Sequence, residues 1–155
     1  MKDIAPFIAG LAGTTAKQRI AAATALGKSG NPAAAEILGT ALEDRSIPVR
    51  SEVVLALGRL NDSAAVPFLI RALDDTEPSI RAAAIAGLGR IRDPAAVAPL
   101  ITCLKDRSME VRIGAAQVLG RLGDRRALEP LRVLRNDPFT DVRDAVSVAI
   151  GWLDR

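Results

Sequence analysis

The 155-residue sequence is 49% hydrophobic but only 3% aromatic, and its formal net charge is +3. A core of small and aliphatic side chains favours closely packed helices over a β-sandwich, which is richer in aromatic and β-branched residues. The lack of histidine excludes His-based catalytic triads and metal cages, and the single cysteine, Cys103, excludes an internal disulfide and an iron–sulfur cluster.

The sequence begins with a charge-poor stretch, which continues without a charged residue from Ile4 to Ala16. It is too short to span a bilayer, which needs about 20 apolar residues. Asp3 and Pro6 also make it a poor signal peptide, so we expect a cytoplasmic protein with no membrane partner. The low charge of residues 1–13 predicts possible self-association through the N-terminal face.

The whole chain repeats with a period of 31 residues. One series consists of Arg19, Arg50, Arg81, Arg112 and Arg143, and another of Gly27, Gly58, Gly89, Gly120 and Gly151. Five units account for the full length: 1–31, 32–62, 63–93, 94–124 and 125–155. We therefore expect one solenoid domain over residues 1–155, in which the first and last units act as caps.

Each unit contains the pattern of two amphipathic helices joined by a turn. In residues 93–106, apolar side chains recur at three- and four-residue steps after an N-cap at Asp93 and Pro94 at the first helical position. The second helices are expected after the N-cap residues Thr15, Ser46 and Ser108, with a capping box between Thr15 and Gln18. The recurring glycine inside these helices indicates a close helix–helix contact or a loosened last turn.

The turns and second helices of the three central units follow one pattern: DRSIPVRSEVVLALGRLND, DDTEPSIRAAAIAGLGRIRD and DRSMEVRIGAAQVLGRLGD. This pattern resembles the HEAT repeat family, specifically its 31-residue branch of PBS-lyase HEAT-like repeats. The last unit keeps DVRDAVSVAIGWLD, whereas the first has Gly13 in place of the turn aspartate and Gln18 in place of an apolar residue. The resemblance implies an all-α fold, a right-handed α-α superhelix (alpha solenoid) of five helix-turn-helix repeats with about ten helices.

The resemblance also implies a structural ladder between neighbouring repeats, formed by the turn aspartate and the arginine six residues later. The matching pairs are Asp44 and Arg50, Asp75 and Arg81, Asp106 and Arg112, and Asp137 and Arg143. A guanidinium fork can bond a carboxylate and turn carbonyl groups together, so a charge repeated in this way is expected to be paired.

The second helices of this family line a concave groove, which makes the exposed positions of these helices the candidate partner-binding residues. They are Lys28, Leu55, Arg59, Ala86, Arg90, Ile113, Gln117, Arg121, Val148 and Trp152. The four cations form a basic row along one edge, which either steers a partner onto an apolar strip or is only a solvated edge. Within the row, Arg59 is the strongest candidate; Trp152 either anchors a partner or packs as a cap. Cys103 occupies a small apolar position and is expected in the core.

The leading interpretation is a non-catalytic protein–protein interaction scaffold without metal or other cofactors. Its partner is expected to be another protein or a peptide, acidic or amphipathic in character. The resemblance leaves two alternatives open: an accessory or chaperone subunit of an enzyme, as in the phycobilin lyases, and a nucleic-acid backbone binder, as in DNA glycosylases built from HEAT-like repeats. The weak basic excess makes nucleic acid the less favoured partner.

Overall fold

The computed structural model describes residues 3–155, and this part of the chain contains ten α-helices, four short 3-10 helices and no β-strand. The predicted all-α solenoid of paired helices is confirmed. The first helices of the five units are α1 (Ala5–Leu11), α3 (Ala34–Gly39), α5 (Val66–Ala72), α7 (Val97–Cys103) and α9 (Leu128–Val133). The second helices are α2 (Ala16–Gly27), α4 (Ile47–Leu60), α6 (Pro78–Ile91), α8 (Met109–Leu122) and α10 (Thr140–Leu153).

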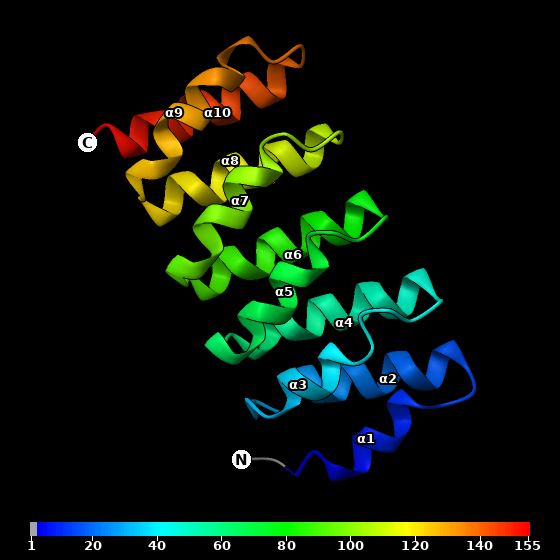
Figure 1. The fold of residues 1–155 in the computed structure, drawn as a ribbon. Helices are drawn as coiled ribbons and strands as arrows, with labels where there is room; N and C mark the ends of the chain where they lie inside the picture. Colours follow the sequence, from blue (N-terminus) through cyan, green and yellow to red (C-terminus); the bar gives the residue numbers. More distant parts are fainter. Residues whose placement is uncertain (1–2) are drawn as a thin grey trace.

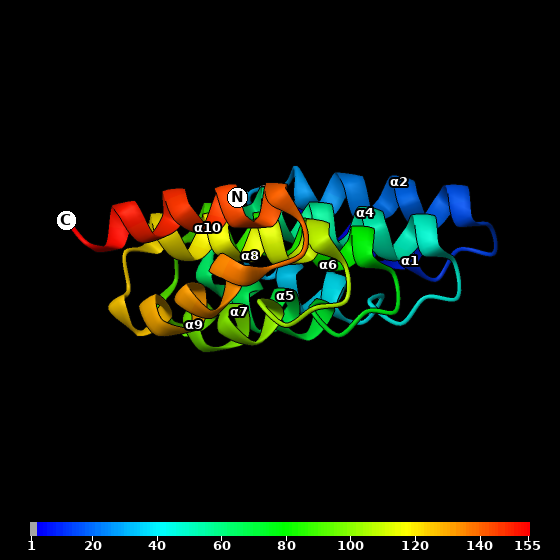
Figure 2. The ribbon, with the colours of Figure 1, turned by 90° about the horizontal axis from the view of Figure 1, so that it is seen from above.

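The helices form two layers that run the length of the stack. The second helices lie side by side, each in contact with the second helix of the next unit, and α3, α5, α7 and α9 form the other layer (Figures 1 and 2). The described chain starts at one end of the stack and finishes at the other (Figure 1). This arrangement presents a single row of second helices, which we call the second-helix face.

The core between the two layers is built from equivalent aliphatic residues of successive units. The second helices contribute Leu26, Leu57, Leu88, Leu119 and Ile150, and the first helices contribute Leu38, Leu69, Leu100 and Leu131, all buried. A lone helix pair could not cover both apolar faces, so each unit is stabilised by burial against its neighbours.

Most of the predicted helix starts are confirmed, but two of the predicted caps work differently. Thr15 and Gln18 form the expected capping box. Ser46 and Ser108 stand at N-cap positions without a side-chain capping bond within residues 3–155; their backbone amides donate instead to the carboxylates of Asp44 and Asp106. At α4 the amide of Val49, which a cap would normally satisfy, already donates to the Ser46 carbonyl.

The first helix of the fourth unit begins as a 3-10 turn. Asp93 accepts a hydrogen bond from the Ala95 amide, as expected of an N-cap, and Pro94 is the first residue of the 3-10 turn Pro94–Ala96 that leads into α7. The third and fifth units also begin with a 3-10 turn, in which Asp62 and Asp124 accept hydrogen bonds from the amides of Ala64 and Arg126.

The recurring glycines lie where neighbouring second helices approach most closely. A Cβ atom on Gly27 would lie 2.7 Å from the Cα atom of Ala56, and one on Gly58 would lie 3.2 Å from the Cα atom of Gly87. At 2.7 Å a Cβ atom does not fit without a shift of the neighbouring backbone, and at 3.2 Å the neighbouring helix would have to move by a few tenths of an ångström. Gly151, which has no described unit beyond it, would have no described atom within 4 Å of such a Cβ.

The N-terminal helix α1 packs on α2 but contains no buried residue. Ile8 is exposed, while Gly10 lies against Ala22. Residues 1–2 of the stretch expected to self-associate lie outside the described residues, and self-association remains a prediction. No helix within residues 3–155 is both long and apolar enough to cross a membrane.

Candidate binding surface

The repeated arginines fasten each unit to the next. Arg81 donates from Nε and Nη2 to the two carboxylate oxygens of Asp106, at 2.8 and 2.7 Å, although Asp106 lies 25 residues later. Arg81 Nη1 also donates to the backbone carbonyl of Asp75, six residues earlier, at 2.8 Å. The aspartate within the same unit therefore contributes its carbonyl oxygen, and the carboxylate comes from the following unit. The same pairs of bonds join Arg19 to Asp44, Arg50 to Asp75 and Arg112 to Asp137.

The two ends of this ladder differ from its centre. Arg19, absent from the predicted ladder because Gly13 replaces the turn aspartate, makes the first rung: its Nη1 donates to the Gly13 carbonyl at 2.9 Å. A backbone carbonyl is available from any residue, so the substitution leaves the rung intact. Arg143 holds the Asp137 carbonyl at 2.7 Å and the Thr140 hydroxyl at 2.9 Å, but no carboxylate among the described residues.

Pairing keeps the ladder aspartates ionised. The hydrogen bond from Arg19 holds the pKa of Asp44 below its ordinary value. Burial alone would raise the pKa of Asp75, but hydrogen bonds from Arg50 and from the Glu77 amide outweigh burial and lower it. The ladder thus satisfies its own charges and acts between units, not toward a ligand.

The side chains left for a ligand lie on the second-helix face. Its four cations, Lys28, Arg59, Arg90 and Arg121, are exposed at the C-terminal ends of α2, α4, α6 and α8. Several large apolar side chains are also exposed there, including Leu55, Val148 and Trp152, at 42%, 52% and 42%. Exposed apolar side chains are informative where they gather into a patch, as Val148 and Trp152 do on α10.

The strongest candidate of the basic row, Arg59, is tied to its own helix. Its Nη1 atom lies 2.5 Å from Oε1 of Glu52, and the same carboxylate oxygen accepts a hydrogen bond from the Thr24 hydroxyl at 2.7 Å. By contrast, Lys28, Arg90 and Arg121 make no ion pair within residues 3–155. The charges of these three cations are therefore more available to a partner than the charge of Arg59.

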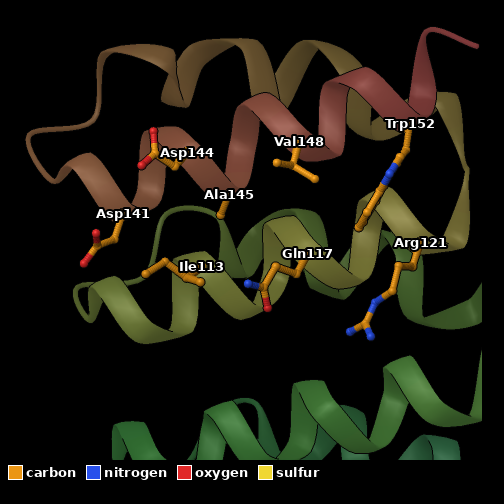
Figure 3. Close-up of a pocket in the computed structure, with 8 residues that line it drawn as sticks. All are labelled: Ile113, Gln117, Arg121, Asp141, Asp144, Ala145, Val148 and Trp152. Atoms are coloured by element: carbon orange, nitrogen blue, oxygen red, sulfur yellow. The ribbon is translucent and has the colours of Figure 1, made fainter.

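The ten candidate residues divide between two hollows of the face, with Lys28 in neither. A hollow of about 280 Å³ between α4 and α6 contains Leu55, Arg59, Ala86 and Arg90. A larger hollow of about 480 Å³ lies between α8 and α10, and we call it the α8–α10 hollow (Figure 3). It is lined by Ile113, Gln117, Arg121, Asp141, Asp144, Ala145, Val148 and Trp152.

Comparison with protein families agrees with the repeat. The family profile of HEAT repeats matches two overlapping segments of the chain, residues 4–86 and 66–151. The chain belongs to the HEAT repeat family. No match was found among curated protein sequences.

HEAT and armadillo repeat folds also appear among similar solved structures. A chain from the complex of CpcE and CpcF of phycocyanin lyase from Nostoc sp. is 27% identical with a TM-score of 0.79; the alignment covers 99% of this chain and 65% of that one. This chain thus spans about 65% of the length of that subunit. A designed armadillo repeat protein in complex with the peptide (KR)4 is 19% identical, with a TM-score of 0.71 and coverage of 97% and 81%. Human deoxyhypusine hydroxylase in complex with glycerol is 17% identical, with a TM-score of 0.55 and coverage of 97% and 84%.

Two acidic residues of this HEAT repeat surface were not among the predicted site residues. Asp141 and Asp144 are exposed on the first two turns of α10 and line one end of the α8–α10 hollow (Figure 3). Their spacing of three residues places both on the same side of a helix and is the sequence signal that could have identified them. Glu52, which neutralises Arg59, could have been found from its position two helical turns before Arg59.

Cys103 lies in the core of the fourth HEAT repeat, as its small apolar position predicts. The side chain is buried, and burial raises the pKa of its thiol to about 11. Such a thiol is almost entirely protonated at neutral pH and is therefore a poor nucleophile.

Proposed function

We propose that this HEAT repeat chain is a non-catalytic protein-interaction scaffold that holds a segment of a partner protein against its second-helix face. The observation that carries the proposal is the α8–α10 hollow, in which the exposed apolar side chains of Val148 and Trp152 lie beside unpaired charges. Exposed apolar surface rimmed by polar groups is typical of protein-binding sites, and tryptophan is enriched at their energetic centres.

The ladder supports this role because it keeps the second-helix face ordered in the unbound protein. Each rung fixes one second helix relative to the next through a two-point ion pair, such as Arg112 with Asp137. A surface that is already ordered loses less conformational entropy when it binds, and this raises the affinity available from a small contact area.

The chemistry of the side chains supports a role without catalysis. The sequence has no histidine, and the one thiol, Cys103, is buried and protonated. The ladder carboxylates are held ionised by arginine, so they are unsuited to exchange protons near neutral pH.

The location that we propose for this protein is the cytoplasm, because a single buried thiol suits its reducing conditions.

The proposal is tested by capturing partners from an extract of the source cells, identifying them by mass spectrometry and measuring the affinity of the purified partner. We expect the variant carrying Arg90→Ser, Arg121→Ser and Val148→Ser to lose at least about tenfold in affinity, equal to about 1.4 kcal/mol, while its urea unfolding curve stays close to that of the wild type. The matched control removes three exposed side chains elsewhere, through Arg107→Ser, Arg125→Ser and Val133→Ser; Val133 is 73% exposed on α9. Equal losses in both variants would contradict a site on the second-helix face.

A second candidate function is that of an accessory or chaperone subunit in a lyase-type complex. It is supported by the likeness, over 99% of this chain, to a subunit of the CpcE and CpcF complex of phycocyanin lyase. A spectral titration with a free bilin tests it directly, because binding in a protein changes the absorption of the pigment. An unchanged spectrum at saturating protein would remove this candidate.

The surface gives less support to a nucleic-acid backbone. Glu110, Asp141 and Asp144 are exposed on the same face as the arginines, and their charges would repel phosphate groups. Binding to DNA that is strong near 50 mM salt and weakens steeply as salt is added would favour nucleic acid instead.

A further inference from the structure

The α8–α10 hollow has opposite charges at its two ends. Asp141 and Asp144 lie at the end formed by the start of α10, whereas Arg121 and Trp152 lie at the other end (Figure 3). Between them the floor is largely apolar, formed by Ile113, Ala145 and Val148 with one polar side chain, Gln117. The hollow is therefore a short apolar trough with an acidic end and a basic end.

The charges of both ends are available to a ligand. The side chains of Asp141, Asp144 and Arg121 are exposed, and none of them makes an ion pair or a hydrogen bond in the part of the chain that the structure describes. They are too far apart to neutralise one another. Arg121 of α8 is equivalent in the 31-residue repeat to Trp152 of α10, and the rise of α10 separates Trp152 from Asp144 by about 12 Å and from Asp141 by about 16.5 Å.

Neighbouring residues strengthen both ends. Glu110, exposed in the first turn of α8, adds a third carboxylate on the acidic side of the face. At the basic end, Arg92 donates to the backbone carbonyl of Arg121 at 3.1 Å, which brings a second guanidinium beside the last turn of α8. The charge of the trough therefore changes from negative to positive along α8 and α10, from their N-terminal to their C-terminal ends.

We propose that the α8–α10 hollow binds a partner segment with a basic residue at one end, an acidic residue at the other and apolar residues between them. This inference rests on the proposed function and specifies the charge pattern of the partner. The basic side chain pairs with Asp141 and Asp144, the acidic side chain pairs with Arg121, and the apolar residues cover Val148 and Trp152. The two charges are about eight to eleven residues apart in a helical segment and about four to five in an extended one.

A uniformly acidic segment fits this trough poorly. Its carboxylates would lie against Asp141 and Asp144, where like charges in close contact cost affinity. A site formed by the basic row alone would select a uniformly acidic partner. The charge pattern of the bound segment therefore distinguishes this inference from binding by the basic row alone.

The test uses a display library of random peptides of about 16 residues, enough to span α8 as a helix. Peptides are selected on the wild-type protein, and their affinities are then measured for the charge-reversed variant Asp141→Lys, Asp144→Lys, Arg121→Glu. We expect selected peptides to carry separated basic and acidic residues and to lose at least about tenfold in affinity for the variant. The same peptides resynthesised with lysine and glutamate exchanged should prefer the variant.

A control variant, Glu36→Lys with Arg125→Glu, reverses exposed charges away from the second-helix face and should leave the affinities unchanged. Urea unfolding curves show whether each variant is folded. If the triple variant does not fold, the single variant Arg121→Glu is used instead. Peptides in which only the acidic residue is replaced by lysine should then bind this variant more tightly than they bind the wild type.

Each other outcome overturns the inference in a recognisable way. Enrichment of uniformly acidic peptides that depend on Arg90 and Arg121 but not on the aspartates would overturn it and leave the proposed function standing. A lack of peptides that depend on any residue of the second-helix face would overturn both. A wild-type dimer in sedimentation that becomes a monomer in the triple variant would assign the hollow to a second copy of this chain.

Discussion

The guanidinium group of Arg81 and the carboxylate of Asp106 meet in two hydrogen bonds of 2.8 and 2.7 Å across a sequence separation of 25 residues. Because Arg81 also holds the Asp75 carbonyl of its own turn, one side chain connects the turns of two successive HEAT repeats. The repeated arginine is therefore a link between units, and its effect on stability depends on whether a next unit is present.

Replacement of a ladder arginine should cost most where both kinds of bond are present. Arg81→Met leaves the largely buried carboxylate of Asp106 unpaired, and we expect the free energy of unfolding to fall by about 3 kcal/mol. Arg143→Met removes only bonds to carbonyl and hydroxyl groups and should cost about 1 kcal/mol. Urea unfolding of both variants measures the difference; equal losses would show that the inter-unit ion pair adds nothing.

Added methyl groups should have opposite effects at two equivalent glycines. Gly27→Ala places a Cβ atom 2.7 Å from the Ala56 backbone, and forcing the helices apart should cost about 1–3 kcal/mol. Gly151→Ala meets no described atom within 4 Å and should gain about 1 kcal/mol from the higher helix propensity of alanine. Thermal unfolding tests the pair, and a stabilised Gly27→Ala protein would contradict the close contact.

The ladder also predicts acid sensitivity. The pKa values of Asp44, Asp75, Asp106 and Asp137 are lowered in the folded protein, so their stabilisation is complete above the ordinary aspartate value of about 4 and is lost as the pH falls through the lowered values. Stability measured by urea unfolding should thus decline below about pH 4. The difference between wild type and Arg81→Met should be largest near neutral pH and shrink in acid, and a difference that grows in acid would exclude this mechanism.

Cys103 should react slowly while the protein is folded. With the pKa raised to about 11, the thiolate fraction at pH 8 is lower by about a hundredfold than for a thiol at the ordinary value of 9.0, and burial slows access further. Labelling with a thiol-specific reagent should be slow in buffer and fast in urea. Rapid labelling of the native protein would mean that α7 opens easily.

Release of Arg59 from its internal partner should increase its availability to ligands. Arg59→Ser is expected to weaken partner binding less than Arg121→Ser, because Glu52 already compensates the Arg59 charge. Glu52→Gln keeps the shape of the side chain but removes its charge and should make binding of an acidic peptide more salt-dependent. Identical effects of Arg59→Ser and Arg121→Ser on affinity would show that the pairing does not matter.

The sequence predicts the fold well because the information is repeated. Every unit carries the same apolar spacing and helix glycine, and all but the first carry the turn aspartate, so an error in one unit is corrected by the others. The predicted ladder does not include Arg19, because Gly13 has no side chain and a backbone carbonyl acceptor has no sequence signature. The sequence predicts a side-chain cap at Ser46, but the Val49 amide of α4 donates to the Ser46 carbonyl, and the Ser46 amide itself donates to the carboxylate of Asp44.

The binding surface is less predictable, since it depends on pairs formed between helices. The side chains of Thr24 and Glu52 belong to different units, and their contact with Arg59 appears only when α2 and α4 are stacked. The acidic end of the α8–α10 hollow can likewise be recognised only in the structure, where Asp144 and Arg121 line opposite ends of one largely apolar hollow. Periodicity identifies the helix positions that face outward, but not which of their charges are already compensated.

A further consequence follows from the fact that every rung spans one boundary only. Insertion of an extra 31-residue module, or deletion of one from the middle, would leave each guanidinium facing an acidic turn as before. Such a molecule can change length by whole modules during evolution. Each added module would create a new surface groove at its boundary, and the core residues of the other modules would stay the same.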